Sequence, residues 1–138
     1  DIPLLTERLG TVIHWLASKD RTRGLRPGLF GASTGAAAAL QAAAELGEKI
    51  GAVVSRGGRP DLAGEEALVR VTVPTLFLVG GLDHGVIELN QQAYEQLAGE
   101  KRLEIIPGAT HLFEEEGKLE EVARLAREWF RTHLTAPA

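Results

Sequence analysis

The sequence contains no cysteine and no methionine among its 138 residues. Without cysteine the chain has no disulfide, no thiolate metal site and no cysteine nucleophile. It also has no apolar run near the roughly 20 residues that a membrane-spanning helix needs. A charged region followed by a short apolar region, typical of a signal peptide, is also missing. These absences favour a cytoplasmic protein.

Positive charge is also in short supply. The chain has 15 Lys and Arg against 19 Asp and Glu, a formal net charge of −4. This balance argues against nucleic acid or an anionic membrane as an electrostatic partner. A hydrophobic share of 44% with 25% charged residues is typical of a soluble globular domain, and the length suits one domain over residues 1–138. Because the chain opens on Asp1 without methionine, we expect it to be a piece of a longer or processed protein.

Short apolar segments alternate with segments of helical periodicity along the chain. The expected strands are 29–31, 50–55, 73–79 and 102–106. The expected helices are 3–19, 33–46, 62–69, 86–97 and 116–134. This alternation predicts an α/β fold, with a parallel sheet of about four strands and helices on both faces.

A G-x-S-x-G motif, Gly31-Ala32-Ser33-Thr34-Gly35, lies between the first expected strand and the Ala-rich helix. In a nucleophile elbow, such a turn lifts the serine hydroxyl clear of the sheet. We expect side chains at Gly31 and Gly35 to clash with neighbouring backbone. The N–H of Thr34 would point at a developing oxyanion, aided by the helix N-terminus. The alternative is a Gly-rich turn in which Ser33 only caps the helix.

Two further residues suited to acyl transfer follow other expected strands. Asp83 lies in the loop after 73–79, and His111 ends the loop after 102–106. In open α/β sheets, active sites gather at the carboxyl ends of the strands. The chain order Ser, Asp, His is that of α/β-hydrolases, so we expect Ser33 as nucleophile, His111 as base and Asp83 as orienter. A turn aspartate and a solvated histidine are the alternatives, and His84 is the rival base.

Other polar residues are less well placed. No H-x-x-x-H spacing or phosphate-binding loop is present, so we expect no metal and no cofactor. The run Glu114–Glu116 is expected to be the charged N-terminus of the last helix. Arg56 and Arg59 could face an acidic substrate, or pair with carboxylates such as Asp61. Ser55 also ends a strand, but it lacks the form of the elbow.

Several segments resemble the α/β-hydrolase superfamily and, within it, the dienelactone-hydrolase-like group. The resemblance covers essentially the whole chain. Two further segments, 1–16 and 53–62, are similar to hydrolase domains that some bacterial proteins carry fused to a phosphoribosyltransferase. The segments that carry the group resemblance are 31–35, 73–83 and 107–113. The resemblance implies carboxylic-ester hydrolysis by Ser33, His111 and Asp83.

The chain departs from this family in two respects. Dienelactone hydrolases proper use a cysteine nucleophile, where this chain has Ser33, so dienelactone itself is not the expected substrate. The chain is similar to the C-terminal half of the family fold and lacks the earlier loop that supplies a second oxyanion donor. The strand 29–31, central in the family, would then form a sheet edge. We expect a homodimer or a companion N-terminal fragment to cover it.

Two functions remain open at this point. The first is a serine esterase that cleaves a small-molecule ester through an acyl-enzyme. The second is a non-catalytic or regulatory module in which the hydrolase fold binds a partner domain such as a transferase.

Overall fold

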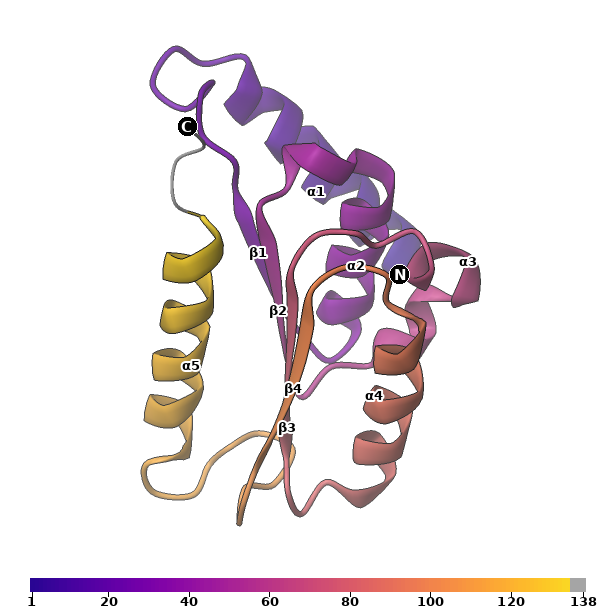
Figure 1. Ribbon diagram of the computed structural model, residues 1–138, viewed down its shortest axis with the longest axis vertical. Coiled ribbons are helices and arrows are strands. Elements are labelled where there is room, and N and C mark those ends of the chain that lie inside the picture. Colours follow the sequence, from indigo (N-terminus) through magenta and orange to yellow (C-terminus); the bar gives the residue numbers. More distant parts are fainter. Residues whose placement is uncertain (135–138) are drawn as a thin grey trace.

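The computed structural model describes residues 1–134, which form one four-stranded parallel sheet with helices on both faces (Figure 1). The strands follow the order β1-β2-β3-β4 across the sheet. They are β1 (Gly28–Ala32), β2 (Ala52–Arg56), β3 (Thr75–Gly80) and β4 (Lys101–Ile106). The helices are α1 (Ile2–Ala17), α2 (Thr34–Leu46), α3 (Glu65–Leu68), α4 (His84–Gln96) and α5 (Lys118–His133), with short 3₁₀ turns η1 (Gly47–Lys49) and η2 (Pro60–Ala63). The α/β prediction is therefore confirmed.

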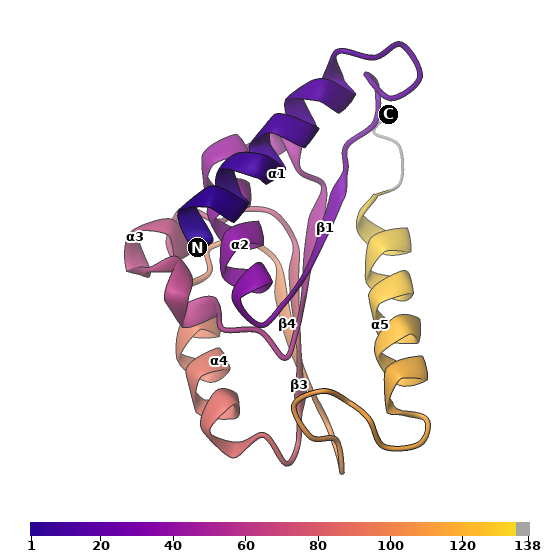
Figure 2. The same cartoon turned by 180° about the vertical axis from the view of Figure 1, so that it is seen from behind.

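The helices divide unequally between the two faces of the sheet. In Figures 1 and 2, α5 stands alone on one face, whereas α1, α2, α3 and α4 lie on the other. Each face has its own apolar core, because successive side chains of a strand point to opposite faces. Val53 and Phe77 pack in the core beneath α2 and α4, while Val54 and Leu78 pack beneath α5.

The Ala-rich segment forms α2, the helix that packs against β1 and β2. Its small side chains are almost completely buried, which allows the helix axis to lie close to the sheet. α1 then packs on the outer side of α2 and has its own contact to it through Thr6, whose hydroxyl donates to Gln41 Oε1 at 2.8 Å. α2 is thus held between the sheet and α1.

The third strand begins later than its apolar sequence predicts. Residues 73–79 were expected to be extended, but β3 starts at Thr75. Pro74 has no N–H to contribute to a sheet ladder, although its carbonyl accepts hydrogen bonds from the Val53 N–H at 2.9 Å and from Trp129 Nε1 at 3.4 Å. All six residues of β3 are buried, as a strand covered on both faces requires.

The first strand, β1, is partly exposed. On β1, the Phe30 side chain is 51% exposed, and β1 pairs only with β2 within the described residues. β1 is thus an edge strand, as expected.

Within residues 1–134, no helix has the length and apolar character required to span a membrane.

All four strands run in the same direction, so their carboxyl ends meet at one edge of the sheet. The loops that follow β1, β2, β3 and β4 therefore converge there. Ser33, Gly57, Asp83 and His111 all belong to these loops or to the turns that they enter. This edge is the candidate active site.

Candidate active site

Ser33 is the single residue between β1 and α2. Its backbone has φ 50° and ψ −123°, a conformation that residues other than glycine rarely adopt. Its hydroxyl makes no capping bond to the helix, so the interpretation of Ser33 as a simple N-cap does not describe this structure. Instead, Ser33 Oγ lies 3.0 Å from His111 Nε2.

The two glycines of the motif differ in what surrounds them. A Cβ on Gly31 would lie 2.5 Å from the carbonyl oxygen of Gly35, so the strand can approach the helix only without a side chain there. A Cβ on Gly35 would meet nothing within 4 Å. The expected clash at Gly35 is therefore wrong for this chain. Gly35 faces the groove along the open side of β1, where no neighbouring strand fills the space.

His111 connects the serine to the predicted acid. His111 Nδ1 lies 2.7 Å from Asp83 Oδ2. With the proton on Nδ1, the ring donates to the carboxylate and leaves Nε2 free to accept the Ser33 hydroxyl proton. The Asp83 side chain is 15% exposed and that of His111 39%, so the base remains accessible while the acid is largely covered. The structure thus brings Ser33, His111 and Asp83 into one line of contacts.

The loop that carries His111 must cross the sheet edge from β4 to reach Ser33 beside β1. It can do so because the strand ends beneath it lack side chains. A Cβ on Gly80 would collide with the Ala109 carbonyl, and one on Gly57 would lie 3.1 Å from the His111 carbonyl oxygen. The Leu82 N–H donates to the Ala109 carbonyl at 2.9 Å, which ties the crossing loop to the loop that carries Asp83.

Glu115 anchors the same crossing loop. Its carboxylate accepts from the Thr110 hydroxyl at 2.7 Å and from the Thr110 N–H at 3.0 Å. These two bonds, the hydroxyl bond first, lower the pKa of Glu115 below its ordinary value of 4.5. The acidic run was expected to begin the last helix, but α5 starts at Lys118. Glu115 is used instead to hold the residue next to His111, a role that its sequence context does not reveal.

Thr34 is the one oxyanion donor that the sequence predicts, and it lies directly after Ser33. It is the first residue of α2, so its N–H has no partner inside the helix. Within residues 1–134, no hydrogen bond satisfies this N–H. The helix dipole adds partial positive charge at the same point. The position therefore suits a developing negative charge beside Ser33 Oγ.

The alternative candidates take other roles. His84 is an exposed residue at the start of α4, and in the described part of the chain the Ser33 hydroxyl bonds to His111 rather than to His84. Ser55 is completely buried in β2, out of reach of a substrate. Arg59 forms a two-point ion pair with Asp61, at 3.0 Å and 2.9 Å, so it is engaged rather than free for an acidic substrate.

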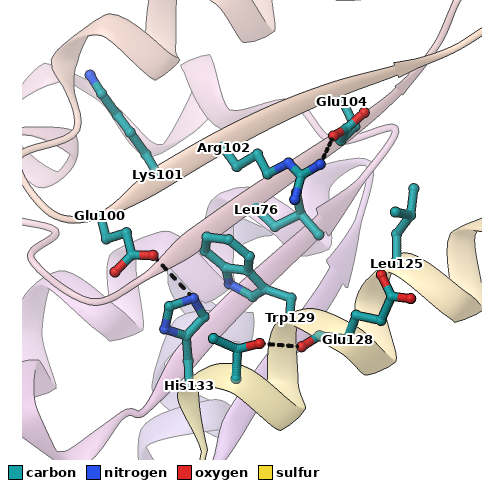
Figure 3. Close-up of a pocket in the computed structure, with 10 residues that line it drawn as sticks. Leu76, Glu100, Lys101, Arg102, Glu104, Leu125, Glu128, Trp129 and His133 are labelled. Carbon is teal, nitrogen blue, oxygen red and sulfur yellow. Dashed lines mark hydrogen bonds and ion pairs between the residues drawn. The ribbon is translucent and has the colours of Figure 1, made fainter.

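A separate hollow of about 530 Å³ lies between β4 and α5 (Figure 3). Four of its lining residues form two pairs: His133 Nε2 lies 3.4 Å from Glu100 Oε2, and Arg102 pairs with Glu104. The His133 ring also packs against the Trp129 ring, with centroids 4.2 Å apart and the two ring planes tilted by 55°. Its boundary includes Glu100, just before β4 begins, so the hollow extends to the end of the sheet opposite Ser33. None of the predicted site residues lines it.

The architecture is that of the α/β-hydrolases. The Paleococcus ferrophilus monoacylglycerol lipase has the same fold, with a TM-score of 0.80 over 96% of this chain and 76% of the lipase at 19% identity. A dienelactone hydrolase from Anabaena variabilis superimposes with a TM-score of 0.95 at 56% identity, over 98% of this chain. The chain belongs to the dienelactone hydrolase family, whose sequence profile matches residues 4–134.

The chain is shorter than the relatives that it matches. It is 56% identical over 137 residues to two proteins of Mycobacterium tuberculosis, from strains CDC 1551 / Oshkosh and H37Rv, which are named as candidate phosphoribosyl transferases. The match includes 99% of this chain but only 31% of each Mycobacterium tuberculosis protein. The match to the Anabaena protein covers 62% of that protein's chain.

The unequal surroundings of the motif glycines give a matched pair of variants. We expect Gly31→Ala to destabilise the fold by about 1–3 kcal/mol, because the added methyl overlaps backbone that cannot move freely. Gly35→Ala should be neutral or stabilising by up to about 1 kcal/mol, because alanine favours a helix. Urea unfolding measures both, and a Gly31→Ala protein as stable as Gly35→Ala would contradict the packing described here.

Acid should weaken the anchor at Thr110. Because the folded-state pKa of Glu115 is lowered, its stabilisation is complete above the ordinary value of 4.5 and is lost as the pH falls through the lower folded value. We expect Glu115→Gln to lower the melting temperature at about pH 7, with the difference from the unsubstituted protein shrinking towards about pH 3. Glu114→Gln is the matched control. Equal differences at both pH values would refute the anchor.

Proposed function

We propose that this protein is a serine esterase, with Ser33 as nucleophile, His111 as general base and Asp83 as the group that orients the histidine. One observation carries the proposal: the contacts Ser33 Oγ to His111 Nε2 at 3.0 Å and His111 Nδ1 to Asp83 Oδ2 at 2.7 Å. A serine hydroxyl is a weak nucleophile, and a base positioned by a third group is what activates it.

The first half of the reaction forms an acyl-enzyme. Ser33 Oγ bonds to the ester carbonyl carbon while His111 Nε2 takes the hydroxyl proton, and the carbonyl electron pair moves onto oxygen. The Thr34 N–H faces that oxyanion. When the tetrahedral species collapses, the bond to the alcohol oxygen breaks, and His111 returns its proton to the departing alcohol.

Water completes the cycle. His111 Nε2 takes a proton from the attacking water, whose oxygen bonds to the acyl carbon. Collapse then breaks the bond between that carbon and Ser33 Oγ, and the serine regains the proton. A carboxylic acid is released. Asp83 keeps its proton count throughout and stabilises the imidazolium that forms in each half-reaction.

The substrate class follows from the family and from the nucleophile. The Anabaena relative, 56% identical, is named a dienelactone hydrolase, and an enol lactone is a cyclic activated ester. Dienelactone hydrolases proper use a cysteine nucleophile. A serine nucleophile in its place suits ordinary small-molecule esters. With Thr34 as the one donor in the described chain, the rate would be limited, since losing one oxyanion donor typically costs about a hundredfold to a thousandfold.

The chain has three serines, which makes the assignment testable. We expect Ser33→Ala to reduce p-nitrophenyl ester turnover by about a thousandfold or more, because no other residue replaces the nucleophile. Labelling by a fluorophosphonate should also disappear, as judged by mass spectrometry of the peptide that spans β1 and α2. Ser18→Ala, in an exposed position, is the matched control.

Unchanged turnover in Ser33→Ala would remove this assignment. If the folded, unsubstituted protein neither labels nor turns over ester, the second function gains the support: a non-catalytic hydrolase-fold module that binds a partner domain. The open edge of the sheet is the observation that favours it.

We also propose that another stretch of polypeptide covers β1, from a companion segment or a second copy. The groove beside β1 has a volume of about 510 Å³ and is bordered by Leu5, Leu9 and Val12 of α1 together with Phe30. An uncovered edge strand with an apolar border is a ready site for pairing. The relatives are longer than this chain, so they contain segments that could occupy the place.

For the chain on its own, we expect light scattering to give a dimer, at twice 14.8 kDa. Phe30→Glu should shift the mass to that of a monomer, because it places a charge on the edge. Val69→Glu, which alters an exposed apolar residue at the end of α3 and outside the groove beside β1, should leave the dimer intact. A monomeric mass for the unsubstituted chain would contradict pairing between copies.

A further inference from the structure

Asn90 is a completely buried amide on α4, the helix that begins directly after Asp83. Its side-chain nitrogen donates to the Gly58 carbonyl at 3.1 Å and to the Val86 carbonyl at 2.8 Å. Because both partners can only accept, they fix the orientation of the amide. The Val86 bond stays within the helix, so the Gly58 bond is the one that ties α4 to another element.

Gly58 lies in the loop after β2, between two elements of the candidate site. The residue that follows it, Arg59, donates its backbone N–H to the Ser33 carbonyl at 3.0 Å. Gly58 itself is wedged against the sheet and α2, since an added Cβ would collide with Ser55 Oγ and with the Ala36 side chain. A continuous path of bonds thus runs from Asn90 through the 58–59 backbone to Ser33.

Ser33 needs such support because its backbone is strained. A residue in a sparsely populated φ/ψ region keeps that conformation only when its surroundings fix it from several sides. The carbonyl of Ser33 accepts one bond from Ala36 of α2, at 3.2 Å, and a second from Arg59. The first comes from the helix that the elbow begins, so the second is the support from outside it.

We propose that Asn90 is a positioning residue for the nucleophile, acting through the Gly58–Arg59 backbone on the carbonyl of Ser33. The same helix carries Asp83 at its N-cap. α4 therefore fixes both ends of the line of contacts. It holds Asp83 directly at its N-cap, and it holds Ser33 indirectly through the buried amide of Asn90. This inference rests on the proposed role of Ser33.

The Arg59–Asp61 ion pair braces the loop from the other side. The two-point contact joins residues two apart, and it lowers the pKa of Asp61, chiefly through the hydrogen bonds from Arg59. The 58–61 segment is thus held at Gly58 by the hydrogen bond from Asn90 and at Asp61 by the ion pair with Arg59. Both contacts limit the movement of the N–H that reaches Ser33.

The test replaces Asn90 by leucine, which has a similar volume and no donor. A misplacement of about 1 Å in a reacting group can cost about a hundredfold in rate, so we expect kcat for p-nitrophenyl ester to fall by about tenfold to a hundredfold. KM should change by less than about twofold, because the substrate contacts remain. Hydrogen exchange at the Arg59 amide should become faster. These measurements use the full chain of 138 residues.

Tyr94→Phe is the matched control. Tyr94 lies one turn further along α4 and donates from Oη to the Lys101 carbonyl at 3.2 Å, at the opposite end of the sheet from Ser33. It loses the same kind of bond from the same helix. We expect its kcat and its Arg59 exchange to match those of the unsubstituted protein. If both variants lose kcat equally, the effect is one of general stability and the inference is overturned.

If Asn90→Leu does not fold, Asn90→Asp replaces it, since the carboxylate keeps the shape and removes the donors. A folded variant of either kind with unchanged kcat and unchanged Arg59 exchange overturns the inference while Ser33→Ala remains inactive. Turnover that survives in Ser33→Ala instead shows that the proposed function has failed. In that case, faster Arg59 exchange in the Asn90 variant would still demonstrate the mechanical link to the elbow.

Discussion

Ser33 adopts φ 50° and ψ −123° between a strand and a helix, and this strained backbone must be fixed by its neighbours. The fold does so from three directions. Gly31 lets the backbone of β1 pass close to that of α2, α2 supplies the Ala36 N–H, and the loop after β2 supplies the Arg59 N–H. The hydroxyl is thereby directed away from the helix and towards His111.

The parallel sheet explains how residues from distant parts of the chain reach the same point. Ser33 follows β1 and Asp83 follows β3, so both start at the same edge. His111 comes from the far strand, β4, and its loop has to cross back over β3 and β2. Glycines at 57 and 80 leave room for that crossing. The same crossing brings His111 between the other two, so the glycines matter as much to the site as the polar residues do.

The open side of β1 is the other consequence of the strand order. In the described residues, the strand that carries the proposed nucleophile has a partner on one side only. The groove beside it reaches Gly35 at the start of α2, so whatever covers the edge also borders the site. The proposed catalysis and the proposed covering of β1 therefore concern adjacent surfaces, because Gly35 of the elbow motif lines the same groove.

The sequence by itself determined the elements and indicated the loops that form the candidate site. Apolar runs and helical spacing placed every strand and helix to within a few residues, because each is covered by a core that its own periodicity describes. The G-x-S-x-G motif and the order Ser33, Asp83, His111 indicated which loops matter, because parallel strands bring their carboxyl ends together.

Only the tertiary structure decided how these residues are held. The supports at Asn90 and Glu115 depend on the loops that fold against them, and nothing in their own neighbourhoods distinguishes a buried bracing amide or an anchoring carboxylate from ordinary helix and loop residues. The motif likewise does not distinguish Gly31 from Gly35, whereas their surroundings in the folded structure differ. A side chain at Gly31 would meet backbone, and one at Gly35 would face open space, because the sheet ends at β1.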